Sequence, residues 1–138
     1  MSVKPYAGVE PQEAADLLGG SGATLLDVRS PQEFAGGAAP GAINVPIKLI
    51  NLEGEMVDNP DFAAAAVAAL EGKSGWVVTT CYAGRRGAAA ANALAATGHD
   101  SINLLGGLRA WEGLGLPVVD ADGAACKAVD PSMLSAGH

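Results

Sequence analysis

The apolar positions of this chain fall into short runs that alternate with segments of helical character. Runs of four or five apolar and β-branched residues, of which residues 76–80 are the clearest, are typical of buried strands. The segments between them have proline near the start or glycine at the end, which is typical of helices. The predicted strands are 24–28, 43–46, 76–80 and 101–105, and the predicted helices or helical turns are 11–18, 31–34, 59–70, 86–96 and 108–111. Because strands and helices alternate, the sequence predicts an α/β fold with a mainly parallel sheet.

Length and composition indicate one domain with a sizeable core. The chain has 138 residues, of which 49% are apolar and only 4% are aromatic. We therefore expect a core of leucine, valine and isoleucine with close alanine and glycine contacts, and Trp76 and Trp111 packed in it or at its rim. We expect this domain to span residues 1–120. Residues 121–138 are small and polar, and we expect them to form a loosely held tail.

Charge and cysteine content narrow the classes of function. A net charge of -7 disfavours nucleic acid and anionic membranes as partners, and no apolar run approaches the roughly 20 residues of a membrane span. Residues 1–7 have neither an apolar stretch nor an Arg/Ser-rich amphipathic one, so we expect no targeting segment within the given sequence, while a transit peptide ahead of it stays open. Cys81 and Cys126 are predicted to be free thiols, so we expect a soluble intracellular protein in a reducing compartment. His99, expected at the surface, and His138 lack metal-site spacing, so we expect no metal and no cofactor.

Cys81 follows the clearest predicted strand, and ligands of parallel sheets bind at the carboxyl ends of the strands. Gly84 allows the backbone to turn so that several N–H groups converge, and a helix begins directly afterwards. Arg85 and Arg86 lie at that helix start, an unfavourable place for cations unless an anion binds there. The residues therefore indicate a reactive thiolate in an anion-binding loop, with a small buried structural cysteine as the simpler alternative.

Three segments resemble one family. Cys81-x-x-Gly84-x-Arg86 resembles the active loop of single-domain rhodaneses, the thiosulfate sulfurtransferases. Residues 25–46 and 105–118 resemble the N-terminal and C-terminal signatures of the family, so the resemblance covers about residues 9–119. Residues 54–62 also resemble an insertion found in plant and algal members. One departure is Gly37-Ala38, where the family often has Gly-His; we expect it to leave catalysis intact.

The resemblance implies a rhodanese-like fold with a five-stranded parallel sheet flanked by helices. It also implies that Cys81 takes sulfane sulfur from thiosulfate as a persulfide and passes it to cyanide or to a thiol such as glutathione or thioredoxin. The two arginines of the loop would hold the sulfonate of this small anionic donor. A plastid stroma or the cytoplasm is the expected compartment. The loop residues expected to bind the donor are Tyr82, Ala83, Gly84, Arg85, Arg86 and Gly87.

Two alternatives remain open at this level. The same cysteine loop could serve arsenate reduction or phosphatase-like oxyanion chemistry, although phosphatases resembling this fold have a loop one residue longer. A catalytically silent rhodanese module that presents the loop to a partner is the other alternative.

Residues outside the loop have mostly structural interpretations. Asp27 and Arg29 end a buried strand and are predicted to form a structural ion pair near the site, with Glu33 as a plausible partner of Arg29. Cys126 is expected to be incidental. The alternative for Cys126 is that the tail folds back and this thiol resolves a Cys81 persulfide.

Overall fold

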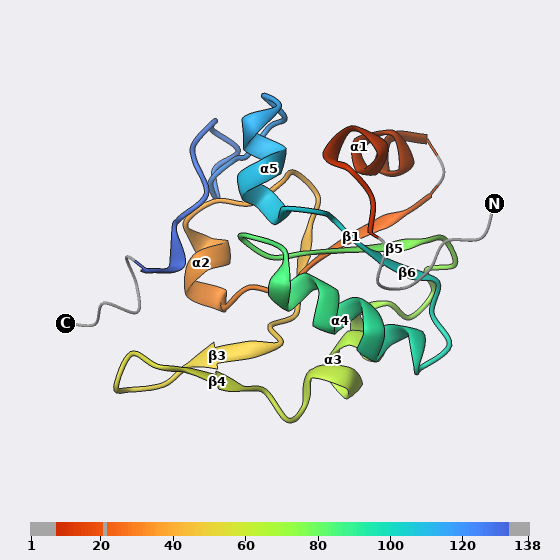
Figure 1. Cartoon of the computed structure of the whole chain (residues 1–138), viewed down its shortest axis with the longest axis horizontal. Coiled ribbons are helices and arrows are strands. Elements are labelled where there is room, and N and C mark those ends of the chain that lie inside the picture. Colours follow the sequence, from red (N-terminus) through yellow and green to blue (C-terminus); the bar gives the residue numbers. More distant parts are fainter. Residues whose placement is uncertain (1–7, 21, 133–138) are drawn as a thin grey trace.

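A computed structural model describes residues 8–20 and 22–132 and shows a parallel sheet between two layers of helices (Figure 1). The sheet has four parallel strands in the order β2-β1-β5-β6, and a separate antiparallel hairpin pairs β3 with β4. The predicted α/β class is therefore confirmed. The elements in chain order are α1 (Pro11–Gly20), β1 (Thr24–Asp27), α2 (Pro31–Ala35), β2 (Ile43–Asn44), β3 (Lys48–Ile50), β4 (Met56–Asp58), α3 (Phe62–Ala69), β5 (Val77–Thr80), α4 (Arg85–Ala95), β6 (Ser101–Asn103) and α5 (Gly107–Gly113).

The five-stranded parallel sheet implied by the resemblance is wrong by one strand, because the outer edge of β6 carries only an isolated bridge. Val9 forms a parallel bridge with Leu104, donating its N–H to the Asn103 carbonyl at 2.8 Å. Gly8, which precedes Val9, has a left-handed φ of 74°, and α1 begins at Pro11, two residues after Val9. Because the backbone turns on both sides of Val9, the outer edge of β6 gains a bridge rather than a full strand.

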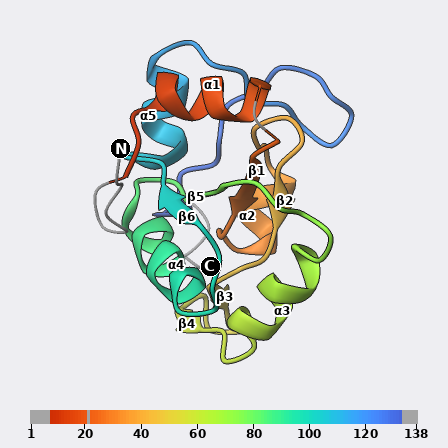
Figure 2. The ribbon, with the colours of Figure 1, turned by 90° about the vertical axis from the view of Figure 1, so that its right-hand side faces the viewer.

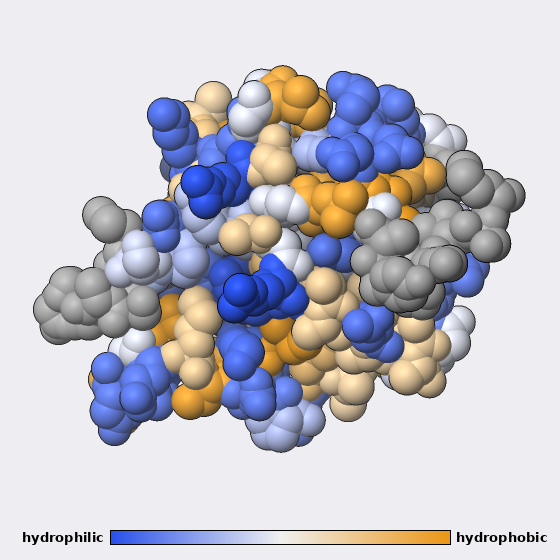
Figure 3. All heavy atoms as spheres, in the orientation of Figure 1, coloured by the Kyte–Doolittle hydropathy of each residue, from blue (hydrophilic) through white to orange (hydrophobic). Residues whose placement is uncertain are grey.

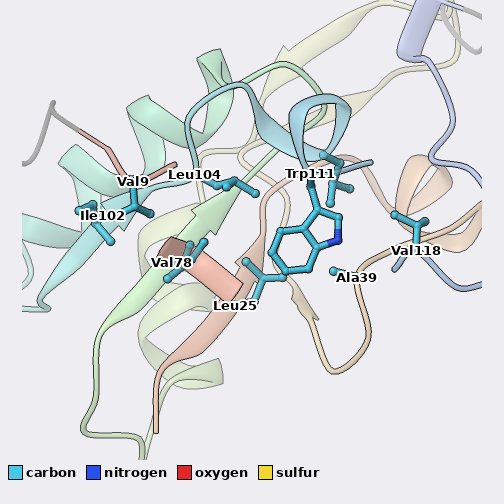
Figure 4. Close-up of a cluster of buried hydrophobic side chains, with 10 residues drawn as sticks. Val9, Leu25, Ala39, Val78, Ile102, Leu104, Trp111 and Val118 are labelled. Carbon is cyan, nitrogen blue, oxygen red and sulfur yellow. The ribbon is translucent and has the colours of Figure 1, made fainter. Parts of the chain in front are cut away.

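The two faces of the sheet carry different helices, as the view in Figure 2 shows, with α1 and α5 on one side and α3 and α4 on the other. Side chains alternate along each strand, so Leu25 packs on the first side and Leu26 on the second. Trp111 is buried in the first cluster, and its indole N–H donates to the Pro117 carbonyl at 2.8 Å (Figure 4). The other tryptophan, Trp76, is partly buried against the same cluster, so both pack as predicted.

The β3–β4 hairpin was not predicted from the sequence. Its strands have only three residues each, too few to show an alternating pattern. The turn between them is organised by Asn51, whose Oδ1 accepts the N–H groups of Glu53 and Glu55 at 3.0 and 2.9 Å. Leu52 at the hairpin tip is fully exposed.

The described part of the predicted tail, residues 121–132, contacts the body of the domain. Val119 bridges Ala38 on one side and Ala125 on the other, and the Cys126 N–H donates to the Val118 carbonyl at 2.9 Å. Further along, the Ala128 N–H donates to a carboxylate oxygen of α5 at 2.9 Å. Residues 133–138 of the predicted tail lie outside the described residues.

The surface seen from the direction of Figure 1 mixes hydrophilic and hydrophobic residues (Figure 3). Within residues 8–20 and 22–132, no helix has the length and apolar character needed to cross a membrane.

Candidate active site

Cys81 lies directly after β5, at the carboxyl end of the parallel sheet, and its side chain is only 1% exposed. Its Sγ accepts two backbone hydrogen bonds, from the Gly84 N–H at 3.0 Å and from the Gly87 N–H at 3.2 Å. Gly84 precedes α4 with a φ of 112°, in the left-handed region where glycine is favoured. The loop thus curls around the sulfur, and the start of α4 points its N–H groups at it. We call these two N–H groups the sulfur cradle.

The first turn of α5 holds the other side of the loop. The Leu108 N–H donates to the Cys81 carbonyl at 2.8 Å, and the Arg109 N–H donates to the Tyr82 carbonyl at 2.9 Å. Gly107 makes this approach possible, because a Cβ at that position would lie 2.5 Å from the Cys81 carbonyl oxygen. The carbonyl groups of the loop therefore face α5, which leaves its N–H groups free to face the sulfur.

Arg86 is committed to an ion pair within the protein. Its two terminal nitrogens donate to the Glu33 carboxylate at 2.7 and 2.9 Å, and the Glu33 side chain is fully buried. Burial opposes both charges, but the hydrogen bonds and mutual attraction prevail: the pKa of Glu33 is lowered, and the pKa of Arg86 is raised. Because the pair is neutral as a unit, Arg86 shapes the loop more than it supplies net positive charge.

Arg85 has the opposite character. It is exposed, and it makes no hydrogen bond or ion pair within the described part of the chain. Its side chain lines the pocket that contains Cys81. Of the two loop arginines, Arg85 is therefore the one available to an anionic ligand.

Asp27 and Arg29 form a fully buried ion pair at 2.7 Å, and Asp27 pairs in the sheet with Thr80, the residue before Cys81. Arg29 also donates to the Gly37 carbonyl at 2.7 Å and to the Glu33 carbonyl at 3.3 Å, so it ties the end of β1 to α2 and to the residues that follow it. The prediction that the Glu33 side chain pairs with Arg29 is wrong. The carboxylate belongs to a capping box with Ser30 at the start of α2, which directs it toward α4 instead.

A pocket of about 360 Å³ opens over the loop, and part of its wall comes from distant segments. Met56 contributes from the β3–β4 hairpin, and Pro131 and Ser132 contribute from the C-terminal segment. None of the three was expected at the site: Met56 lies in the segment 54–62 that resembles a plant and algal insertion, to which no site role was assigned, and Pro131 and Ser132 lie in the predicted tail. The lining residues are Met56, Cys81, Tyr82, Ala83, Arg85, Arg86, Pro131 and Ser132.

Cys126 does not line this pocket, although the segment that carries it does fold back. Its thiol faces the Gly36 carbonyl at 3.8 Å. Burial and the carboxylates of Asp120 and Glu112 raise the pKa of the Cys126 thiol, which disfavours a nucleophilic thiolate there. These observations disfavour a resolving role for Cys126.

Two other positions singled out in the sequence lie away from the pocket. Ala38 is bridged to Val119 and lines a different, apolar hollow, so the missing histidine opens no gap around Cys81. His99 is half-buried, and its Nδ1 lies 2.8 Å from the Thr97 hydroxyl. Among the described residues, no group of three or more His, Cys, Asp or Glu side chains could hold a metal ion.

The arrangement as a whole combines three chemical properties. Two backbone N–H groups donate to the sulfur of a buried thiol, so they would stabilise a negative charge on that sulfur. An open pocket gives a small molecule access to that sulfur, and Arg85 can bind its anionic end. Such a site suits nucleophilic attack by Cys81 on a small anion.

Comparisons with known proteins agree with this geometry. Residues 10–114 match the family model described as a rhodanese-like domain. The chain is 40% identical over 105 residues to thiosulfate sulfurtransferase 16, chloroplastic, of Arabidopsis thaliana, covering 75% of this chain and 85% of that protein. It is 33% identical over 102 residues to the thiosulfate:glutathione sulfurtransferase of Homo sapiens, covering 72% and 87%. A solution structure of a rhodanese-like domain from Anabaena sp. has the same fold, with a TM-score of 0.67, 22% identity, and coverage of 93% of this chain and 89% of that one.

Proposed function

The chain belongs to the rhodanese-like domain family, and from that premise we propose that it transfers sulfane sulfur from thiosulfate to a thiol through a persulfide on Cys81. The observation that carries the proposal is the sulfur cradle, in which Gly84 and Gly87 both direct N–H groups at Sγ. A structural cysteine would gain nothing from two converging donors, whereas a sulfur that must bear negative charge throughout a reaction cycle needs them.

In the first half-reaction, the Cys81 thiolate attacks the outer, sulfane sulfur of thiosulfate. A new S–S bond forms to Cys81, the S–S bond inside thiosulfate breaks, and its electron pair leaves with sulfite. The product is a Cys81 persulfide anion, whose added sulfur occupies the pocket above the loop. Arg85, which lines this pocket, would bind the sulfonate and stabilise the charge that collects on departing sulfite.

In the second half-reaction, an acceptor thiolate attacks the outer sulfur of the persulfide. The acceptor becomes a persulfide, and the S–S bond to Cys81 breaks to regenerate the thiolate in its cradle. Cyanide can replace the thiol and leaves as thiocyanate. The name of the human relative supports glutathione as the acceptor, and the name of the Arabidopsis relative supports a plastid location.

The proposal is tested by loading the protein with thiosulfate and measuring its mass. We expect one added sulfur, located at Cys81 by peptide mapping, and its removal by cyanide or glutathione. Cys81→Ser should lose both loading and turnover, while Cys126→Ser, the matched control, should keep them because that thiol lies outside the pocket. Turnover without any persulfide on Cys81 would refute the mechanism.

Initial rates with several donors separate sulfur transfer from the alternative oxyanion chemistry. We expect thiosulfate to exceed mercaptopyruvate, and arsenate and a phosphate ester to give little turnover. If arsenate or the ester were the faster substrate, the thiosulfate proposal would be wrong.

A further inference from the structure

Asn103 contacts both of the glycines that form the sulfur cradle. Its side-chain Nδ2 donates to the Gly84 carbonyl at 3.2 Å. Its Oδ1 faces Gly87 so closely that a Cβ on that glycine would lie 2.3 Å from this oxygen. One side chain from β6 therefore lies against the two residues whose N–H groups bind the Cys81 sulfur.

The sheet register explains how Asn103 reaches the loop. Asn103 on β6 pairs with Thr79 on β5, and both side chains meet the loop at the start of α4. The Thr79 hydroxyl donates to the Gly87 carbonyl at 2.7 Å, as the Asn103 amide does to the Gly84 carbonyl. Two neighbouring strand residues thus hold the carbonyl groups of the same two glycines. Figure 1 shows the start of α4 beside the ends of β5 and β6.

Fold stability alone does not account for an asparagine at this position. Asn103 is 6% exposed, and its Oδ1 has no hydrogen-bond partner among the described residues, which destabilises the folded state. The Gly84 carbonyl also accepts the Ala88 N–H at 3.0 Å, so it would remain hydrogen-bonded without Asn103. Leucine has the same heavy-atom branching as asparagine, so it would replace the unpartnered oxygen with a methyl group at the same place.

We propose that Asn103 is a positioning residue for sulfur transfer. It fixes Gly84 and Gly87 in the orientation that aims both N–H groups at the sulfur, and it acts on the Cys81 thiolate and persulfide only through them. This inference rests on the proposed function. Part of the orientation of the two N–H groups therefore comes from β6, a strand that contributes no reacting atom.

The decisive variant is Asn103→Leu, compared with wild type for stability and for each half-reaction. We expect an unfolding midpoint equal to or above that of wild type. We expect single-turnover loading by thiosulfate to slow roughly tenfold, the effect of losing about one hydrogen bond's worth of transition-state positioning. The isolated persulfide should decay faster by a similar factor, while KM for thiosulfate should change little because Arg85 is untouched.

Asn44→Leu is the matched control. Asn44, like Asn103, is the last residue of a parallel strand. Its side chain donates to the main-chain carbonyl groups of Asp27 at 3.0 Å and Arg29 at 2.9 Å, and these lie outside the sulfur cradle. We expect this variant to lose stability and, at a temperature where it remains folded, to load sulfur at nearly the wild-type rate. Stability and sulfur loading would then respond to different asparagines.

Several outcomes would overturn the inference. Asn103→Leu that loads and holds sulfur as wild type does would show that the amide is dispensable. A loss of loading matched by an equal loss of folded protein would show a structural role only. If Asn103→Leu does not fold, Asn103→Asp decides: it keeps the shape but replaces the donor with a carboxylate, and normal loading there would overturn the proposal.

Failure of the proposed function is distinguishable from failure of this inference. A wild type that never takes sulfur refutes the function itself. The rate of Cys81 alkylation by iodoacetamide still tests the cradle in that case, because it needs no sulfur donor. We expect alkylation of Asn103→Leu to be several-fold slower than that of wild type at neutral pH, and equal rates would refute the positioning role.

Discussion

The ion pair between Glu33 and Arg86 is predicted to be a main support of the active loop, and Glu33→Gln tests this. The Glu33 carboxylate is fully buried and accepts both terminal nitrogens of Arg86, whose side chain is 12% exposed. Glutamine keeps the shape but removes the charge, so Arg86 is left nearly buried without a counter-ion. The two residues are 53 positions apart in the sequence, so their pairing fixes the position of α2 relative to α4.

The magnitude follows from burial. Removing one partner of a buried ion pair lowers the free energy of unfolding by about 3–5 kcal/mol. Because Arg86 is slightly exposed, we expect a loss of about 3 kcal/mol for Glu33→Gln. With an unfolding entropy of roughly 2.1 cal/mol/K per residue, a chain of 138 residues should lose about 10 °C in Tm. Arg86→Gln should cost at least as much, because it strands a carboxylate with no exposure at all.

Denaturant unfolding of both single variants and of the double variant Glu33→Gln/Arg86→Gln gives a double-mutant cycle. We expect a coupling free energy of about 2–3 kcal/mol. Asp58→Asn is the control, because its partner Lys48 is 41% exposed and Asp58 is 86% exposed; such surface pairs contribute within about 1 kcal/mol. A coupling near zero for the Glu33 cycle, or one no larger than for the control pair, would refute the reasoning.

The same pair predicts a pH dependence. The pKa of Glu33 is lowered in the folded protein from its ordinary value of 4.5, so the unfolded chain binds the proton more readily. The contribution of Glu33 to stability is therefore complete above about pH 4.5 and is lost as the pH falls through the lower, folded value. Wild type should lose stability more steeply than Glu33→Gln below pH 4.5, and parallel curves would contradict this.

Two further predictions concern the pocket. Arg85→Gln should raise KM for thiosulfate roughly tenfold without moving the unfolding midpoint, because it removes one charge-assisted contact to the donor. Arg109→Gln, an exposed arginine outside the pocket lining, is the matched control, and equal effects of the two would contradict the assignment. Deleting residues 129–138 removes Pro131 and Ser132 from the pocket wall and should raise kcat/KM for mercaptopyruvate relative to thiosulfate. An unchanged ratio of these two values would show that the segment does not select the donor.

The sequence was sufficient for features that depend on residues close together in the chain. A strand of β-branched residues, then cysteine, glycine and a helix start, predicts a thiol facing backbone N–H groups, and the structure has two such bonds to Sγ. Apart from the β3–β4 hairpin, the order of strands and helices was likewise predictable from local pattern. Element ends were less so: β6 ends at Asn103 rather than at residue 105, because the chain turns there toward α5.

Features that depend on tertiary contacts were not predictable in the same way. Arg86 looked like a ligand for the donor, but its partner Glu33 lies on another helix, and no local pattern joins the two. Met56 and Ser132 reach the pocket through a hairpin and a folded-back segment whose sequences carry no strong periodicity. In the sequence, Asn103 looks like an ordinary strand residue. Its contacts with Gly84 and Gly87 are what suggest the proposed positioning role.

The ion pair between Arg86 and Glu33 affects which reaction the loop can catalyse. A tetrahedral oxyanion such as phosphate presents three oxygens that need donors, and loops that bind it usually supply a free arginine and several N–H groups. Here Arg86 is neutralised by Glu33, which leaves Arg85 as the free arginine of the loop, and the N–H groups of Gly84 and Gly87 converge on the cysteine sulfur itself. The donors are thus arranged around one atom rather than around a group of oxygens. That arrangement stabilises charge on sulfur before and after transfer, so it favours sulfur exchange over phosphate or arsenate chemistry.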